Sequence, residues 1–275
     1  MRLLIVLFFV FSTAINAQIS CSPEDKIRFE KKLAQIKNLN AHSFGDTLVS
    51  IGNSFLGTPY VEKTLEIGQE ENLVINLRGL DCTTFVENVL AFSFLLRSKT
   101  TTFETFGNQI KTVRYRDGLL NGYPSRLHYF TDWIRNNNEK GLVNDITADL
   151  GGVIVEKSVN FMGTHRELYP FLTDEDNFNA MLAVEKELAN QPLCILPQDK
   201  IETVETKLQN GDIIALATSI GGLDVTHTGF VLKVKGRAHL LHASSAGAVT
   251  ITEEPLVDYL RKIKHNTGII VARPK

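Results

Sequence analysis

The stretch from Leu80 to Phe94, LDCTTFVENVLAFSF, places an acidic residue, a thiol and two hydroxyl residues at the start of a largely apolar run. Apolar residues cover most of the helical circumference, which predicts a buried, central helix. Asp81 is a favourable N-cap, so Cys82 would take the first helical position, where free N–H groups and the helix dipole favour a thiolate. Thr83 and Thr84 are small, so they leave the approach of a substrate to the Cys82 sulfur uncrowded. We therefore expect a nucleophile here, with the Cys82 amide facing an oxyanion.

The chain begins with the layout of a secretory signal peptide. A single cation, Arg2, precedes nine apolar residues from Leu3 to Phe11 and a polar stretch that ends at Ala17. Nine residues are too few to span a bilayer, which takes ~20. We expect residues 1–17 to be a signal peptide, and the mature protein to be exported to the periplasm or cell envelope without a transmembrane segment. Lipid attachment at Cys21 is the less favoured alternative, because QIS before it lacks the usual Leu and small-residue pattern.

The composition is that of an ordinary globular protein. The 29 basic and 31 acidic residues nearly balance, which argues against a nucleic-acid partner because such proteins usually carry a basic excess. The 43% of hydrophobic residues can form a sizeable core. We expect a single catalytic domain over residues 22–275. The sequence does not indicate an oligomeric state.

Helix signals come first along the chain and strand signals last. Ser22 and Pro23 predict a helix start, and apolar residues repeat at helical spacing from Phe44 to Phe55. The middle is mixed, with a candidate strand at 151–157 and a candidate helix at 179–190. The last quarter holds short β-rich runs separated by turn residues: GDIIALAT, TGFVLKVK, AHLLHAS, AVTIT and TGIIVAR. This order predicts an α+β fold, with helices packed on a C-terminal antiparallel sheet.

The cysteine count is odd for an exported protein, so at least one of Cys21, Cys82 and Cys194 is unpaired unless it pairs between chains. Apolar neighbours around Cys194 favour a buried, inert thiol. A nucleophilic Cys82 would need a base and a group that orients the base. Seven histidines are available, at positions 42, 128, 165, 227, 239, 242 and 265.

The hairpin VTHTGFVLKVKGRAHLLHASS narrows this choice. A two-residue loop at Lys235-Gly236 would place Gly229 opposite His242, so that His227 and His242 share one face, ~7–8 Å apart at the backbone, and His239 faces the other way. A three-residue loop would shift the register by one residue, so that His239 and not His242 would share a face with His227. Gly229 would leave room for a substrate or the nucleophile.

Two histidines on one face also fit a metal site. No further ligand lies at zinc spacing, so we expect no metal and no cofactor. A thiol at a helix N-terminus, followed by histidines on a later sheet, is instead the papain-like order, which is recognised by roles rather than by position.

Five segments resemble, in the right order, the motifs of NlpC-type papain-like cell-wall hydrolases: FLGTPYVEKTL, LDCTTFVENVL, LQNGDIIAL, THTGFVLKV and LLHASSAGAVTI. The wider chain, with SRLHYFTDWI, resembles the N-acetylmuramoyl-L-alanine amidase-like family within that superfamily. The resemblance implies Cys82 as nucleophile, His227 as general base and His242 as orienting residue. It also implies Tyr60 near the thiolate or oxyanion, and Asp81 and Ser244 as substrate or network partners.

Compact members of this superfamily have a shorter gap between nucleophile and base, so residues 99–206 look like an insertion, and inserted loops often shape a cleft. Arg126 could meet a substrate carboxylate, and Tyr129 or Trp133 could stack on a sugar. The alternative, at least as strong, is that Leu127, Phe130 and Trp133 are core residues at helical spacing. No role is assigned to His128 or His165.

The resemblance implies cleavage of the amide between the lactyl group of N-acetylmuramic acid and L-Ala, through a Cys82 thioester. The substrates would be peptidoglycan fragments (muropeptides), small soluble ones being favoured because no wall-binding repeat is visible. One alternative is an endopeptidase that cuts the stem peptide between D-Glu and the diamino acid. Another is a non-catalytic muropeptide-binding module. The sequence does not decide between amidase and endopeptidase, nor whether the sugar must be in a 1,6-anhydro form.

Overall fold

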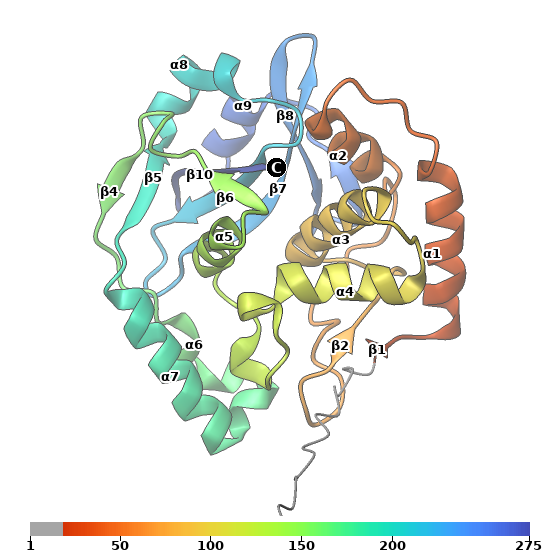
Figure 1. Ribbon diagram of the computed structural model, residues 1–275. Helices are drawn as coiled ribbons and strands as arrows, with labels where there is room; N and C mark the ends of the chain where they lie inside the picture. Colours follow the sequence, from red (N-terminus) through yellow and green to blue (C-terminus); the bar gives the residue numbers. More distant parts are fainter. Residues whose placement is uncertain (1–18) are drawn as a thin grey trace, which may run out of the picture.

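The computed structural model describes residues 19–275, and the predicted signal peptide lies outside this range. Three N-terminal helices lead the fold (Figure 1): α1 (Pro23–Ile36), α2 (Phe44–Asn53) and α3 (Cys82–Leu96). α1 starts where predicted, with a capping box in which the Ser22 side chain accepts from the Asp25 N–H at 3.2 Å and the Asp25 carboxylate accepts from the Ser22 N–H at 2.8 Å. A small parallel pair, β1 (Ile19–Ser20) and β2 (Leu73–Val74), lies near the N-terminus.

The main sheet of the described chain has eight strands, and every pairing in it is antiparallel. Its order is β4-β5-β10-β6-β7-β8-β9, with β3 paired to β10. The strands are β3 (Val143–Asp145), β4 (Val153–Val155), β5 (Leu193–Pro197), β6 (Ile213–Thr218), β7 (Val225–Val234), β8 (Arg237–Ala243), β9 (Val249–Ile251) and β10 (Asn266–Pro274). The α+β prediction with a C-terminal antiparallel sheet is confirmed.

Residues 99–206 are built into this sheet. They supply β3, β4 and β5, together with α4 (Phe103–Arg114), α5 (Phe130–Glu139), α6 (Phe161–Thr164), α7 (Glu175–Ala189) and α8 (Ile201–Val204). The candidate strand at 151–157 corresponds to β4, and the candidate helix at 179–190 to the longer α7, which starts after its N-cap Asp174. Six short 3₁₀ segments complete the chain with α9 (Leu256–Arg261): 116–118, 123–125, 166–168, 170–173, 198–200 and 205–207.

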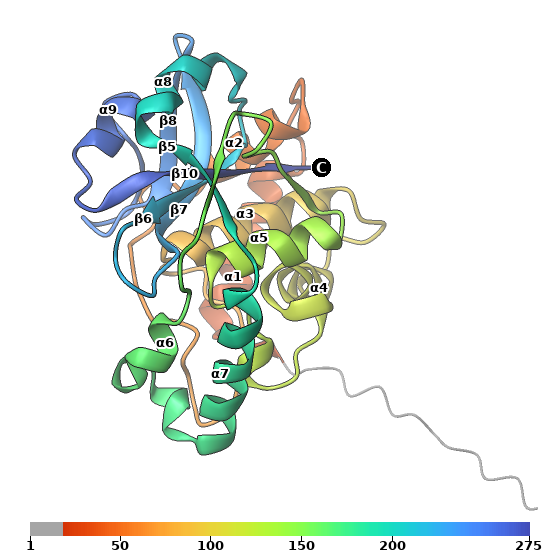
Figure 2. The ribbon, with the colours of Figure 1, turned by 90° about the vertical axis from the view of Figure 1, so that its left-hand side faces the viewer.

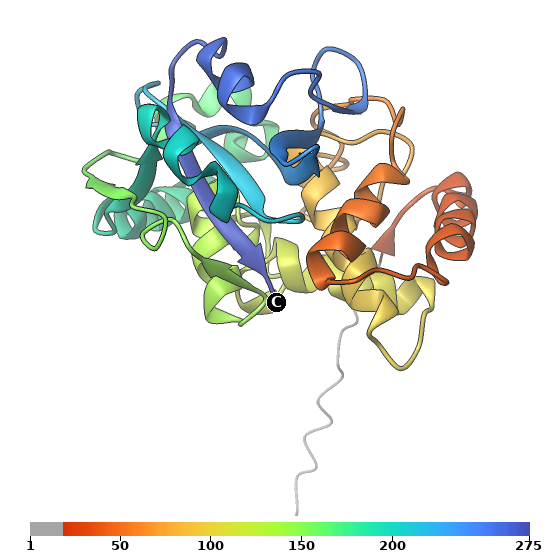
Figure 3. The same ribbon diagram turned by 90° about the horizontal axis from the view of Figure 1, so that it is seen from above.

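Two hydrophobic clusters lie on opposite faces of the sheet, as Figure 2 shows by placing α3 and α9 on different sides. The larger cluster joins α3 to β7, where the rings of Phe85 and Phe230 meet edge to face at 5.8 Å. The smaller cluster packs α9 against Val231 and Leu240. Seen from above in Figure 3, α1 and α2 lie on one side of the molecule and most of residues 99–206 on the other. α3 therefore occupies the centre, as its apolar circumference predicted.

The β7–β8 hairpin has the register that the sequence predicted. Val234 pairs with Arg237, and the two loop residues, Lys235 and Gly236, have φ values of +50° and +84°. Positive φ at both central positions is the geometry of the favoured two-residue hairpin turn. Glycine is required at position 229 for packing and not for substrate room, because a Cβ there would lie 2.8 Å from the Cβ of His242.

Candidate active site

The N-terminus of α3 presents the candidate nucleophile. Asp81 caps the helix as predicted: its Oδ1 accepts from the Thr84 N–H at 2.7 Å, and the Thr84 hydroxyl accepts from the Asp81 N–H at 2.9 Å. Cys82 follows as the first helical residue, and its own N–H has no acceptor among the described residues. Cys82 as a whole residue is half-buried and lines a cavity. A free N–H beside a reachable sulfur is a suitable donor for an oxyanion.

The two histidines predicted to share a face are in direct contact. His227 Nε2 lies 2.6 Å from His242 Nδ1, and the two rings are nearly perpendicular, with centroids 4.8 Å apart. The other ring nitrogen of His227, Nδ1, has no partner among the described residues. His242 is 2% exposed and its ring packs edge to face on Tyr259 of α9 at 5.7 Å. The predicted pair is therefore present, with one His227 nitrogen held and the other free.

Two cavities meet at Cys82. One, of about 130 Å³, is lined by Cys82 and His227 together with the aromatic residues Tyr129, Phe130 and Tyr169. The other, of about 300 Å³, is charged and is lined by Cys82 with Tyr60, Glu62, Lys63, Asp81 and Arg126, among others. The nucleophile candidate thus lies where a smaller cavity of mixed character meets a larger, charged one, and the base candidate borders the smaller cavity.

The surroundings of the site keep its groups uncharged. Burial, followed by the nearby Asp81 charge, raises the pKa of the Cys82 thiol to about 12, although hydrogen bonds from the Thr228 backbone and from Thr83 oppose the rise. Burial lowers the pKa of His227 to about 3 and that of His242 to about 4. Burial therefore acts against the lowering of the Cys82 pKa that the helix N-terminus predicts.

Tyr60 is in the position that the sequence predicted for it. It lines the charged cavity with Cys82, and burial raises the pKa of its hydroxyl to about 12, so that the hydroxyl stays protonated and able to donate. Ser244 lies at the end of β8, where its hydroxyl accepts from the Ala246 N–H at 3.3 Å. Ser244 lines neither of the two cavities at Cys82. A contact between Ser244 and substrate stays a prediction.

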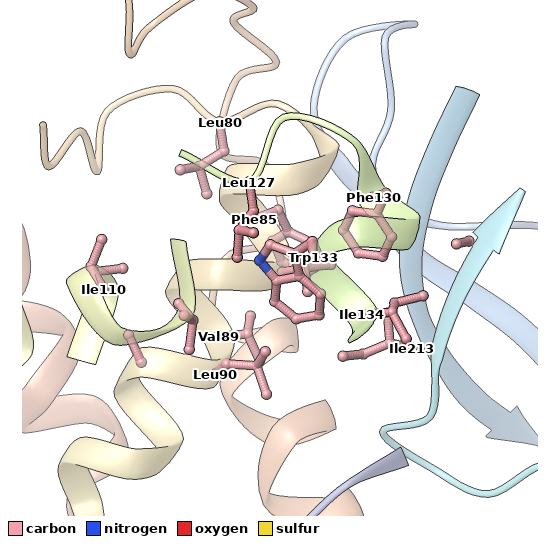
Figure 4. Close-up of a cluster of buried hydrophobic side chains, with 14 of the residues drawn as sticks. Leu80, Phe85, Val89, Leu90, Ile110, Leu127, Phe130, Trp133, Ile134 and Ile213 are labelled. Atoms are coloured by element: carbon pink, nitrogen blue, oxygen red, sulfur yellow. The ribbon is translucent and has the colours of Figure 1, made fainter. Parts of the chain in front are cut away.

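Trp133 does not stack on a substrate sugar, and that prediction is wrong. Its side chain is 0% exposed and lies parallel to the ring of Phe130 at 4.9 Å, inside the core cluster of Figure 4. Tyr129 borders the smaller cavity, but it is 2% exposed and its hydroxyl donates to Glu185 at 2.6 Å, so it forms a wall rather than a stacking platform. The alternative that these residues are core is the one the structure supports.

Arg126 lies on the charged cavity but is 9% exposed. Its guanidinium pairs with Glu71 at 3.2 Å and with Glu66 at 3.5 Å, and it lies over the ring of Tyr123. A substrate carboxylate would have to compete with two carboxylates of the protein. A role for Arg126 in binding substrate stays a prediction.

Three residues at the site were missed from the sequence. Asp224 lines the smaller cavity, and Tyr169 and His128 line both cavities. Asp224 stands three residues before His227, so its closeness to the base could have been noticed in the sequence. Tyr169 and His128 lie within residues 99–206, and only tertiary packing brings them to the site. His165, by contrast, stacks on Phe161 and lines neither cavity.

Within the described part of the chain no group of three or more His, Cys, Asp or Glu side chains is arranged to hold a metal ion. Across residues 19–275 no helix has the length and apolar character needed to cross a membrane. Cys194 is half-buried beside β4, with Gly152 so close that a Cβ there would lie 2.8 Å from the sulfur.

Fold and site together define an α+β protein in which a thiol at a helix N-terminus shares a cavity with one histidine of a contacting pair. Residues 50–269 match the N-acetylmuramoyl-L-alanine amidase-like family (AmiA-like), and the chain belongs to this family. Family membership indicates a hydrolase that acts on peptidoglycan. Comparison with curated proteins gives no significant match.

Solved structures agree with this assignment. A Bacteroides uniformis N-acetylmuramoyl-L-alanine amidase, determined at 1.07 Å resolution, is 35% identical, with a TM-score of 0.79 over 84% of this chain and 99% of its own. A Bacteroides fragilis protein provisionally described as a xylanase is 41% identical, with a TM-score of 0.76 over 81% of this chain and 98% of its own. A Legionella pneumophila protein at 19% identity and a TM-score of 0.65, covering 91% and 93% of the two chains, shares the fold.

Proposed function

We propose that this protein is a papain-like cysteine hydrolase of the NlpC type that cleaves the amide between N-acetylmuramic acid and L-Ala in muropeptides. The observation that carries the proposal is the arrangement of His227. Its Nε2 is engaged by His242, its Nδ1 has no partner among residues 19–275, and the residue lines the cavity that it shares with Cys82. A base held through one nitrogen and open at the other is what an activated thiol requires.

The reaction requires one of the two tautomeric arrangements that the contact between His227 and His242 allows. For Nδ1 of His227 to accept a proton, its Nε2 must carry hydrogen and donate to Nδ1 of His242. His242 is then protonated on Nε2, on the ring that packs against Tyr259. His242 thereby orients the base without exchanging a proton with substrate.

Each proton has a place to go in the proposed reaction. His227 Nδ1 takes the proton of the Cys82 thiol as the sulfur attacks the lactyl carbonyl carbon, and the Cys82 N–H and the Tyr60 hydroxyl stabilise the resulting oxyanion. The C–N bond breaks as His227 returns the proton to the L-Ala amine. Water, deprotonated by His227, then hydrolyses the thioester to a lactyl carboxylate and a free thiol. Because the resting groups are neutral, proton transfer accompanies attack.

The carboxylates around the charged cavity support amide hydrolysis over glycoside hydrolysis, which needs two carboxyl groups at the scissile bond. Asp81 caps α3, Glu66 pairs with Arg126 at 3.5 Å, and Glu87 is buried in a 2.7 Å ion pair with Arg114. Each of these three groups already has a structural partner. Glu62, the fourth carboxylate on this cavity, is exposed and has no partner among the described residues, so it supplies one free carboxyl group and not the pair.

The test is mass spectrometry of a defined disaccharide-tetrapeptide incubated with the protein, with Cys82→Ala as control. Release of intact tetrapeptide and free disaccharide by the wild type alone is expected. Release of a dipeptide would show instead that the protein is the stem-peptide endopeptidase. Equal product from Cys82→Ala would overturn the cysteine mechanism. The predicted export signal and the modest cavities favour soluble fragments in the cell envelope as substrates, and efficient release of material from intact sacculi would contradict that preference.

A further inference from the structure

His128 stands at the junction of the two cavities. It lines both of them together with Cys82, Thr83 and Tyr169, and it belongs to the extended segment that leads into α5. No step of the proposed reaction uses it. Because this half-buried residue lines both cavities beside the nucleophile, it is placed to contact a ligand that spans them.

The hydrogen bonding of His128 fixes its tautomer. Its Nε2 lies 2.9 Å from the backbone carbonyl oxygen of Tyr123, which only accepts, so Nε2 carries the hydrogen. The Tyr123 ring packs against the imidazole at 4.3 Å and holds its orientation. The lone pair is therefore on Nδ1, which has no protein partner among the described residues and is not sealed from solvent.

The ring also stays neutral. Burial, with the Arg126 charge behind it, holds the pKa of His128 well below its ordinary value, so Nδ1 remains an acceptor across the working pH range. The groups that would surround the scissile bond on the other side, the Cys82 N–H and the Tyr60 hydroxyl, are donors. A fixed acceptor opposite them complements an N–H or O–H group of the substrate.

We propose that His128 is a substrate-positioning residue whose Nδ1 accepts a hydrogen bond from an N–H or O–H of the muropeptide bound across Cys82. This inference rests on the proposed function. The bound group is not a carboxylate, because a neutral acceptor offers nothing to one. His128 takes no part in proton transfer, so its loss alters binding and orientation without moving the pH profile.

Two substitutions separate the two nitrogens of the ring. His128→Gln keeps a donor near Nε2 for the Tyr123 carbonyl but loses the acceptor, whereas His128→Asn keeps an acceptor near Nδ1 but loses the tie to Tyr123. We expect His128→Gln to lower kcat/KM on the disaccharide-tetrapeptide roughly tenfold, the effect of one hydrogen bond, mainly through KM. His128→Asn should retain most activity but melt at a lower temperature. The opposite ranking in activity, or a shifted pH profile, would overturn the proposal.

A second substrate identifies the donor. Lactyl-L-Ala-D-Glu lacks the sugar but keeps the scissile amide. If a sugar hydroxyl or acetamido N–H is the donor, wild type and His128→Gln should hydrolyse this compound equally. If a peptide N–H is the donor, the tenfold difference should persist. Both results support the acceptor role, and equal activity of the two proteins on both substrates would refute it.

The wild-type control keeps this inference apart from the proposed function. Hydrolysis of the muropeptide by the wild type, without a difference between the two His128 variants, would refute the inference alone. Failure of the wild type to release tetrapeptide would refute the amidase. Calorimetric binding of the same muropeptide to Cys82→Ala, with and without His128→Gln, would then decide the role of His128: weaker binding of the double variant supports it, and equal or absent binding refutes it.

Discussion

The carboxylate of Asp224 caps helix α5 through Thr131, a residue 93 positions earlier in the chain. Its Oδ2 accepts from the Thr131 N–H at 2.8 Å and from the Thr131 hydroxyl at 2.7 Å. Tyr129, the residue at the N-cap position of α5, provides no side-chain cap of its own. Asp224 also precedes β7 and lines the cavity that contains Cys82 and His227. Helix α5, within residues 99–206, is thus fastened to the chain just ahead of the candidate base.

Replacing Asp224 by Ala should destabilise the fold and disturb the site together. The Thr131 N–H and hydroxyl would be left buried without a partner, which costs about 1–3 kcal/mol in the free energy of unfolding. We expect kcat/KM to fall as well, because the wall beside His227 loosens. Urea unfolding and muropeptide turnover measure the two effects. Thr131→Val, which removes only the hydroxyl, is the matched control and should cost less. If Asp224→Ala were as stable as the wild type, the cap would have no energetic role.

The role of His242 is tested by two substitutions that differ in one acceptor. His242→Asn keeps an oxygen near the position of Nδ1, so it can still accept from Nε2–H of His227, whereas His242→Ala removes that acceptor. Loss of orientation should cost about 10²-fold in kcat for the alanine variant. The asparagine variant should recover most of that loss. Steady-state kinetics on the disaccharide-tetrapeptide give the comparison, and equal activity of the two variants would argue against an orienting role.

Much of the site followed from local sequence rules. The Asp81 cap depends on residues three positions apart, and the facing of His227 and His242 depends on a two-residue turn, so short-range geometry was enough for both. The strand β5 was missed because LCILP is short and apolar, and it becomes a strand by pairing with β10. Such long-range pairing leaves no periodic signal within five residues.

Charge and exposure were harder to predict than position. The pKa of Cys82 depends on how deeply the helix start is buried, which the sequence of α3 alone does not reveal. Trp133 and His128 belong to one short segment, yet the first is sealed in the core and the second opens on the cavities. Which of the two residues is buried depends on how the segment packs between α3 and the sheet, and not on their spacing in the sequence.

The protonation state of Cys82 can be read from its alkylation. With a pKa raised to about 12, the thiol is almost wholly protonated at pH 7, and the reactive thiolate fraction grows tenfold with each pH unit below that value. We therefore expect the iodoacetamide rate at Cys82 to rise steeply from pH 7 to 9 without levelling. A fast, pH-independent rate across this range would show a preformed thiolate and contradict the expectation.

A matched variant and peptide mapping complete that measurement. Asp81→Asn keeps a good helix cap but removes the second cause of the raised pKa, so it should label faster at each pH. The thiols of Cys21 and Cys194 also have pKa values raised by burial, so the modified peptide must be identified by mass spectrometry.

The core position of Trp133 gives a prediction that separates packing from sugar binding. Trp133→Ala should lower the free energy of unfolding by about 3–5 kcal/mol, because a fully buried ring is replaced by a cavity beside Phe130. Trp133→Phe keeps a stacked ring and also removes a buried indole N–H that has no acceptor among the described residues, so it should retain most of the stability. KM for the disaccharide-tetrapeptide should stay within about twofold of wild type in Trp133→Phe, since one lost stacking contact would change it by more. A large rise in KM with unchanged stability would instead show that Trp133 contacts the substrate.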